Sequence, residues 1–302
     1  MNFCSVTVWY NPDESSVQNI LTYSPRCEKC YVVDNSSGDN SSLAQKIPNA
    51  VYIPNLQNLG IAAALNAGCS RALSDGFDLC MTMDQDSSWN AEELGRYLEL
   101  CAQNYSKTAV SFCPNARYAA PTSWLGDARR LLRSFLKKKK GEGGSDLPAA
   151  APSENRPEKK TPMDCCITSG NVISLLAWKK VGGFYEPFFI DEVDHEFCFR
   201  LKENGFEIYK FEGCLMAHVL GTPKKPFYPC VSHHSGVRLY YIFRNAMFQK
   251  KLHPAYFEKL NYRTQISDRL KSLVFNFKLF QLRYYFKALR DFKRGTLGKF
   301  KG

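Results

Sequence analysis

The sequence lacks long apolar runs, and this and other absences limit what the chain can be. No apolar stretch reaches the roughly 18 residues that a membrane-spanning helix requires. Residues 1–6 show neither the basic nor the apolar region of a secretory signal peptide. Residues 3–16 contain no glycine, which argues against the glycine-rich phosphate loop with which nucleotidyltransferases typically begin. We therefore expect a cytoplasmic globular protein.

The sequence also lacks the paired cysteine motifs of a zinc ribbon. Cys27 and Cys30 form a Cys-x-x-Cys motif, but no second pair follows at a suitable spacing. The twelve cysteines are dilute in a chain of 302 residues, and most lie within apolar runs, as reduced and buried thiols do. The pattern disfavours both a disulfide framework and a structural zinc site.

Basic residues far outnumber acidic residues at the end of the sequence. Residues 248–302 contain fourteen basic residues against three acids, so this segment carries the whole formal net charge of +11. A segment of this kind requires an anionic partner, which is nucleic acid, membrane lipid or a phosphorylated substrate. Its Tyr and Phe residues recur at core-like helical spacing, so we expect no nucleic acid.

Short β-rich runs alternate with segments of helical periodicity along the first 200 residues. Expected strands comprise 6–10, 31–33, 51–53, 77–83, 109–113 and 168–174, and expected helices comprise 15–23, 61–68, 92–104 and 177–184. This alternation predicts an α/β fold with a doubly wound, mostly parallel sheet. The early strands end in Asp, Asn and Gly, and such ends line one crevice in folds of this kind.

Asp84 and Asp86 follow an apolar run that begins at Leu79. Because side chains i and i+2 of an extended segment share a side, both carboxylates are expected at the carboxyl edge of the sheet. A hard divalent cation such as Mg²⁺ relieves the repulsion between them. The alternative is a strand followed by a polar turn.

A second acidic stretch places four acids within six positions, bordered by aromatic residues: Asp191, Glu192, Asp194 and Glu196. Acids in the first turn of a helix suit the helix dipole, which explains part of this pattern. A carboxylate held against aromatic walls also acquires a raised pKa, as a general base requires.

Two segments differ from the rest in composition. Residues 137–162 combine lysines with Gly, Pro, Ser and Glu, which predicts a mobile loop. Residues 248–302 form a basic helical extension in which apolar side chains recur at helical spacing: Ile266, Leu270, Leu273, Phe277, Phe280 and Tyr284. This face either lies on an anionic membrane or packs on the catalytic domain, which we place at 1–247.

Six motifs occur in the order seen in family 2 glycosyltransferases of the GT-A fold, and the resemblance covers roughly residues 3–250. They comprise 34–37, 58–62 with Asn66, 84–87, 169–171, 182–184 and 193–200. Within that family, segments 84–87, 189–200 and 238–245 most resemble rhamnosyltransferases. The resemblance implies a GT-A domain, a nucleotide-diphosphate sugar donor and a divalent cation, Mg²⁺ or Mn²⁺.

The resemblance also implies roles for individual residues. Asp34, at an exposed strand end, accepts a hydrogen bond from the pyrimidine, and Arg244 stabilises the leaving diphosphate. The other donor-binding residues it implies are Tyr10, Asn11, Asn58, Gly60, Asn66 and Asp84. The implied metal ligands are Asp84, Asp86 and His218, although a histidine satisfied by hydrogen bonds is an equal interpretation of His218.

Counting back from Arg200, the family's base aspartate corresponds to Asp194 and its second aspartate to Glu196. Val193 replaces the glutamate that usually precedes the base. Asp191, Glu192 and Glu196 remain acceptor-side candidates.

The implied activity is inverting, metal-dependent sugar transfer in cell-surface polysaccharide biosynthesis. The expected donor is dTDP-L-rhamnose, and the expected acceptor is a hydroxyl of a glycan or of a polyprenyl-diphosphate-linked saccharide. The Gln-x-x-Arg-Trp signature of processive synthases is absent. The alternatives are a UDP-hexose or UDP-galactofuranose transferase of the same fold and, more remotely, a sugar nucleotidyltransferase. An acceptor of this kind suggests peripheral association with the inner face of the cell membrane.

Overall fold

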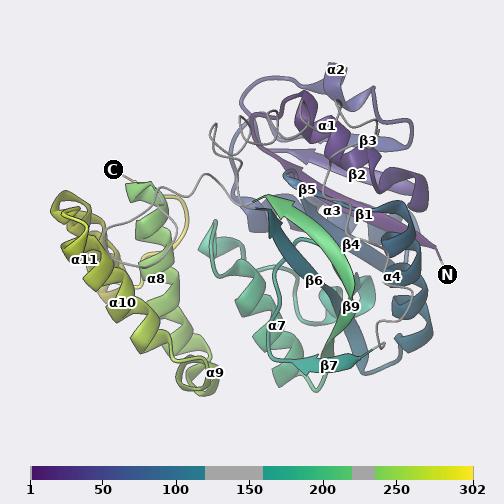
Figure 1. Ribbon diagram of the computed structural model, residues 1–302. Helices are drawn as coiled ribbons and strands as arrows, with labels where there is room; N and C mark the ends of the chain where they lie inside the picture. The colour runs from purple at the N-terminus through teal and green to yellow at the C-terminus, as the bar shows by residue number, and fades with distance from the viewer. Residues whose placement is uncertain (1, 120–158, 220–234, 302) are drawn as a thin grey trace, which may run out of the picture.

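A mixed β-sheet forms the frame of the protein (Figure 1). The structure is a computed structural model, and it describes residues 2–119, 159–219 and 235–301. In the described residues the strands run in the order β3–β2–β1–β4–β8–β6–β9–β5, and β7 pairs with β9. They are β1 (Phe3–Trp9), β2 (Lys29–Asp34), β3 (Ala50–Pro54), β4 (Leu79–Asp84), β5 (Ser87–Ser88), β6 (Ala109–Ala119), β7 (Lys160–Met163), β8 (Asn171–Ser174) and β9 (Glu207–Val219).

The first four strands are parallel, and their register brings their polar ends together. Trp9 of β1 is paired with Asp34 of β2, and Val8 of β1 is paired with Asp84 of β4. β8 is antiparallel to β4 and β6, whereas β6 and β9 are parallel. The predicted α/β class with a mixed sheet is confirmed, but the sheet is not mostly parallel, because four of the described strand pairings are parallel and four are antiparallel.

Helices cover both faces of this sheet, because successive side chains of each strand point to opposite faces. Cys4 and Val6 of β1 pack with α3, α6 and α7, while Trp9 packs with α1 and α4. These helices are α1 (Glu14–Leu21), α3 (Ile61–Ser74), α4 (Ala91–Asn104), α6 (Leu175–Lys180) and α7 (Val193–Glu203), and a short α2 (Ser41–Ala44) follows β2. Gly68 brings α3 close to β1, since a Cβ there would lie 2.4 Å from Val6.

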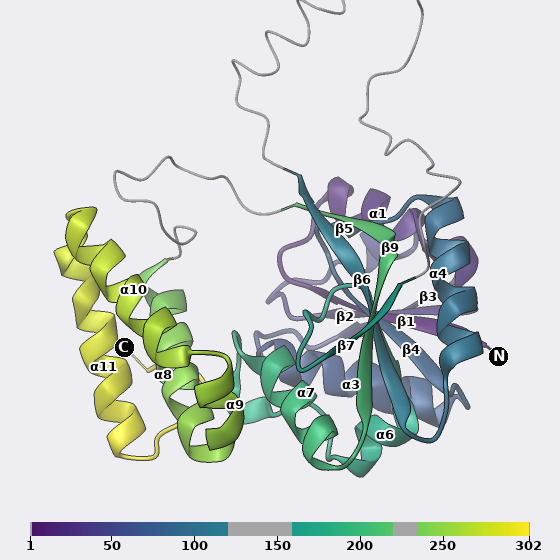
Figure 2. The same cartoon turned by 60° about the horizontal axis from the view of Figure 1, so that its bottom comes forward.

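Four further helices stand beside this domain (Figures 1 and 2). They are α8 (Gly236–Leu252), α9 (Pro254–Lys259), α10 (Tyr262–Phe275) and α11 (Leu282–Lys293). α8 and α11 pack along each other, and Phe248 and Phe292 join the main core. The apolar spacing predicted a stripe that runs through Phe277 and Phe280, but the helix ends at Phe275, and Phe277 adopts a positive φ of 56°. The division at residue 247 stays a prediction, and α8 runs across that position.

The predicted mobile loop comprises residues 137–162, and its part up to residue 158 lies outside the described residues. Its last residues are not a loop, because 160–162 belong to β7 and pair antiparallel with β9. All eleven described cysteines are free thiols. Among the described residues, no helix is both long enough and apolar enough to cross a membrane.

Candidate active site

Asp84, Asp86 and His218 lie together at the carboxyl edge of the sheet. One ligand atom from each falls within 4.8 Å of the others. The pairing of β5 with β9 brings His218 opposite Ser87, and the Ser87 hydroxyl lies 2.5 Å from His218 Nδ1. Ser169 donates to Ser87 Oγ at 2.7 Å and accepts from the Asp84 amide at 3.2 Å. These contacts fix the His218 ring and the backbone at Asp84.

The carboxylate of Asp84 is electrostatically unfavourable in the folded chain. Burial, together with the charges of Asp86 and Asp194, raises its pKa to about 7, against the opposing charge of Arg238. A divalent cation relieves this repulsion, and the two carboxylates are ligands of the kind that Mn²⁺ and Mg²⁺ prefer. The residues present therefore fit the implied metal.

Asp194 lies in the first turn of α7, where its carboxylate accepts from the backbone N–H of His195 at 2.9 Å. Burial raises its pKa, and the charge of Glu192 adds to this effect, whereas His195 opposes it. Its charge also acts on Asp84. Asp194 thus borders the cluster at the end of β4, and its raised pKa suits a general base.

Asp191 lies beside Asp194 and forms an ion pair with Arg238 of α8, with an Nη2–Oδ1 distance of 3.1 Å. Burial raises the pKa of Asp191, whereas Arg238 lowers it. Arg238 is 49% exposed and its charge also acts on Asp84. Arg238 is therefore a half-exposed cation at the site, held in place by the Asp191 carboxylate.

Glu192 is part of a buried group with His195 and Tyr262. The Tyr262 hydroxyl donates to Glu192 Oε2 and lies 2.8 Å from His195 Nδ1. Burial alone would raise the pKa of Glu192, but the charge of His195 and the hydrogen bonds of both partners lower it. The same carboxylate, with Asp194, raises the pKa of His195 well above its usual value. Glu192 therefore serves as a partner of His195, which differs from the acceptor-side role predicted for it.

The loop that carries Asp191 is held by α8. Phe189, Asp191 and Glu192 all have positive φ angles, which are costly for residues other than glycine. Asn245 Nδ2 donates to the carbonyl oxygens of Phe188, Ile190 and Asp191 at 2.8–3.0 Å. This amide therefore offsets the strain and fixes the approach to α7.

Arg244 does not face the diphosphate side, contrary to the prediction. Its guanidinium is fully buried and donates to the carbonyl oxygens of Phe188, at 3.0 Å, and of Gly298, at 2.6 Å. It also lies between the rings of Tyr240 and Tyr241. Buried carbonyl groups need such donors, so Arg244 is structural.

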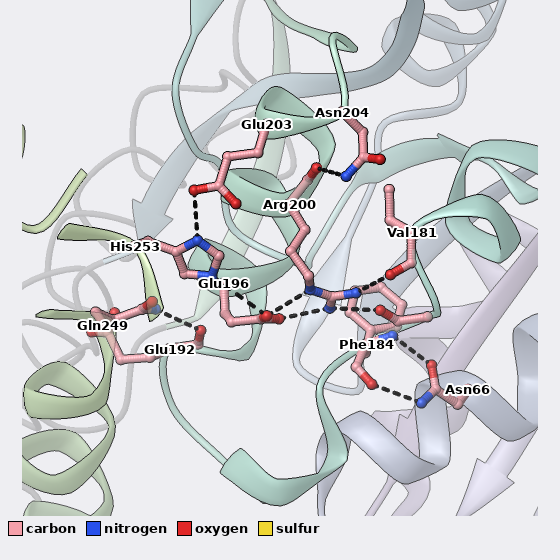
Figure 3. Close-up of polar contacts among 11 residues, drawn as sticks. Asn66, Val181, Phe184, Glu192, Glu196, Arg200, Glu203, Asn204, Gln249 and His253 are labelled. Carbon is pink, nitrogen blue, oxygen red and sulfur yellow. Dashed lines mark hydrogen bonds and ion pairs between the residues drawn. The ribbon is translucent and has the colours of Figure 1, made fainter. Parts of the chain in front are cut away.

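Glu196 is also not on the acceptor side (Figure 3). Its buried carboxylate forms a two-pronged ion pair with Arg200, at 2.6 and 2.7 Å, one helical turn further along α7. Arg200 in turn donates to the carbonyl oxygens of Val181 and Gly183. The pair holds α7 against the turn after α6. The predicted acceptor-side role of Glu196 is wrong, because its carboxylate is bound to Arg200.

The residues predicted to bind the nucleotide lie at the ends of β1 and β2. Tyr10 is exposed, and its amide donates to the Gln85 side chain at 2.8 Å. Asn11 follows with a positive φ of 49°. Asp34 is only 1% exposed and accepts from the Ser36 amide, Asn40 and Tyr52. The expectation of an exposed carboxylate at Asp34 is therefore wrong, because the loop after β2 folds over it.

Gly60 and Asn66 contact residues that follow more than a hundred positions later in the chain. A Cβ at Gly60 would lie 2.6 Å from the carbonyl oxygen of Phe189, so the close approach that the glycine permits is to Phe189. Asn66 bonds both the amide and the carbonyl of Phe184, at 2.7 and 2.9 Å (Figure 3). Asn58 accepts from the Gly60 amide at 2.9 Å. Their predicted part in shaping a nucleotide pocket stays a prediction, and these contacts are all within the protein.

Four functional candidates were missed by the sequence prediction: Ser87, Ser169, Arg238 and Tyr262. Ser87 and Ser169 lay within quoted motifs but offered only common hydroxyl groups. Arg238 opened the motif in which Arg244 was chosen, and only its place in the first turn of α8 separates the two. Tyr262 had no sequence signal, since its role depends on how α10 meets α7.

A mixed sheet flanked by helices, with the Asp84, Asp86 and His218 cluster at its carboxyl edge, matches the GT-A fold class. Structural neighbours agree with this class. The chain matches S. aureus TarS 1–349 with a TM-score of 0.58 at 15% identity, covering 98% of this chain and 81% of that one. It matches GalNAc-T7, crystallised with UDP, GalNAc and Mn²⁺, with a TM-score of 0.54 at 10% identity, covering 74% of this chain and 44% of that one.

Two sequence comparisons show which proteins the chain resembles. Residues 15–152 match the model of glycosyl transferase family 2. The dTDP-rhamnosyl transferase RfbF of Shigella flexneri is 28% identical over 253 residues, covering 81% of this chain and 78% of that protein. The chain is therefore similar to family 2 glycosyltransferases over residues 15–152, and over most of its length to a dTDP-rhamnosyl transferase.

Proposed function

We propose that the protein transfers L-rhamnose from dTDP-rhamnose to a hydroxyl group of a glycan acceptor, with inversion at the anomeric carbon. The observation that carries the proposal is the cluster of Asp84, Asp86 and His218, whose ligand atoms lie within 4.8 Å of one another, with the charge of Asp194 acting on Asp84. This arrangement places the proposed site of the donor diphosphate next to the carboxylate of Asp194, whose pKa is raised. The choice of donor is supported by the similarity to the Shigella flexneri dTDP-rhamnosyl transferase.

Asp194 acts as the base in this proposal. Its carboxylate takes the proton of the acceptor hydroxyl as that oxygen attacks the anomeric carbon, and the bond to the diphosphate breaks on the opposite face. A burial-raised pKa strengthens the base relative to an exposed aspartate. No covalent sugar–enzyme intermediate is required.

Asp84, Asp86 and His218 would hold a divalent cation, Mg²⁺ or Mn²⁺. The cation supplies positive charge that stabilises the leaving diphosphate. Arg238 adds a second positive charge from α8, in the role first assigned to Arg244. The group of Glu192, His195 and Tyr262 orients the first turn of α7.

The wider setting is proposed to be cell-surface polysaccharide synthesis at the cytoplasmic side of the membrane. The acceptor is a glycan, and a polyprenyl-diphosphate-linked saccharide suits the basic extension at 248–302. Such an acceptor brings its own negative charge to this part of the chain.

A thermal-shift panel of sugar nucleotides tests the donor. Samples contain dTDP-rhamnose, UDP-glucose, UDP-GlcNAc or UDP-galactofuranose, each with Mn²⁺, Mg²⁺ or a chelator. We expect dTDP-rhamnose with a cation to raise Tm most, because a ligand that binds only the folded state stabilises it. A larger shift with a UDP-hexose contradicts the donor, and equal shifts with the chelator contradict the metal.

A further inference from the structure

Exposed apolar side chains gather at the connection between α10 and α11. Twelve large hydrophobic residues are exposed in the described parts of the chain, and six of them lie within residues 274–286. We call them the apolar tip: Val274, Phe275, Phe277, Leu279, Phe280 and Phe286. Phe277 is 85% exposed and Phe280 is 71% exposed. A monomeric soluble protein gains nothing from such a cluster, which is typical of an interaction site.

The backbone conformation at Phe277 adds to the free-energy cost of exposing its ring. The Phe277 amide donates to Val274 O at 3.1 Å and the Lys278 amide to Leu273 O at 2.8 Å, which is the hydrogen-bond pattern of a Schellman cap. Glycine normally occupies the left-handed position of this cap, but here it is Phe277, with φ of 56°. The chain therefore holds an aromatic ring in solvent at a position where a smaller residue is more stable.

The charge around the tip identifies the partner. Residues 269–290 contain six basic residues and no acid. Arg283 lies over the ring of Phe280, with its guanidinium carbon 3.8 Å from the ring centroid. Exposed aromatic rings interleaved with basic side chains suit the surface of an anionic bilayer, where the rings enter the acyl region and the cations meet the headgroups.

We propose that the apolar tip docks the protein on an anionic lipid bilayer. The tip lies at the end of the α10–α11 pair that is opposite α9, beside the catalytic domain (Figures 1 and 2). Two signals act together there, since neither a few rings nor a few charges alone binds a membrane stably. The proposal goes beyond the proposed function and does not depend on the identity of the donor sugar.

Vesicle sedimentation with the full chain tests the proposal. The probes are vesicles of phosphatidylcholine alone and of phosphatidylcholine mixed with phosphatidylglycerol, each at low and high salt. The test variant combines Phe277→Ser with Phe280→Ser. Leu176→Ser, which removes a leucine that is 58% exposed on α6, is the matched control. Sugar-nucleotide hydrolysis by each variant shows that the catalytic domain is folded, independently of membrane binding.

We expect the unaltered chain and Leu176→Ser to sediment with anionic vesicles at low salt, and the double variant to bind about tenfold more weakly. Arg283→Glu should weaken binding to anionic vesicles as well. The proposal is overturned if the unaltered chain stays in solution, or if the double variant sediments like it. The proposal is also overturned if neither the unaltered chain nor the double variant binds vesicles, and the double substitution instead abolishes self-association or binding to single-stranded DNA.

Discussion

Tyr262 of α10 donates its hydroxyl hydrogen bond to Glu192, and the two residues are 70 positions apart in the chain. Glu192 lies two residues before Asp194, at the start of α7. The helical extension therefore reaches into the candidate active site and is more than an appended segment. It holds the first turn of α7 through Tyr262, while Asn245 of α8, just before the extension, holds the preceding loop.

Tyr262→Phe tests this link. The substitution keeps the ring and removes the hydrogen bonds to Glu192 and His195, so α7 is held less firmly. We expect kcat to fall by about threefold to tenfold, the value of one such hydrogen bond, with the donor Kd unchanged. Steady-state kinetics and calorimetry measure the two quantities. Tyr256→Phe, at a tyrosine that stacks on Phe199, is the matched control, and unchanged kcat in Tyr262→Phe would refute the link.

Arg238 and Arg244 should behave as a functional and a structural residue, respectively. Arg238→Ala removes a half-exposed cation near Asp84, so donor turnover should fall at least tenfold with little change in unfolding free energy. Arg244→Ala leaves buried carbonyl groups without donors and should lower the unfolding free energy by roughly 2–5 kcal/mol. Urea unfolding and steady-state kinetics of both variants decide the matter, and the reverse pattern contradicts the assignment.

Asp86→Ala should abolish metal-dependent donor binding. The Asp86 side chain is 51% exposed, so its loss leaves the fold intact while one proposed cation ligand disappears. Calorimetry with dTDP-rhamnose, with and without Mn²⁺, provides the measurement, and Asp268→Ala on the surface of α10 is the control. Donor binding that stays dependent on the cation in Asp86→Ala removes this residue from the metal site.

The raised pKa of Asp194 predicts the acid side of the pH profile. A base acts only when it is ionised, so activity is lost as the pH falls through its pKa. Burial raises that pKa, and the loss should therefore occur above the pH of about 3.9 at which an ordinary aspartate titrates. The profile of kcat is measured at saturating donor, with the donor Kd determined at each pH. A limb at or below the ordinary value contradicts a buried base.

The sheet and the ends of its strands were predictable from sequence, because hydrophobic periodicity reports the buried faces of strands directly. Asp84 and Asp86 were found in this way, since they end a buried strand. The cluster with His218 required the family resemblance, because β9 is far from β4 in the sequence. The Arg200 partner of Glu196 is one helical turn away, so this pairing was open to prediction and was overlooked.

The remaining differences depend on tertiary contacts that no local pattern encodes. Gly60 was assigned to a nucleotide, but its close neighbour is Phe189, which follows in the chain more than a hundred residues later. Asp34 is buried only because the next loop folds back on it. Phe277 ends a helix at a position that glycine usually occupies, so the helical spacing continued past the true end of α10.

The proposed mechanism depends most on Asp194 as the base, and one comparison of variants tests this role directly. Transfer of rhamnose from dTDP-rhamnose is measured for the unaltered chain, Asp194→Asn and Asp191→Asn at saturating donor, with the donor Kd measured in parallel. Loss of the base should reduce kcat by about 10²- to 10⁴-fold in Asp194→Asn and leave the donor Kd unchanged. Asp191→Asn should retain most activity. Undiminished transfer by Asp194→Asn, or a collapse in Asp191→Asn instead, contradicts the account.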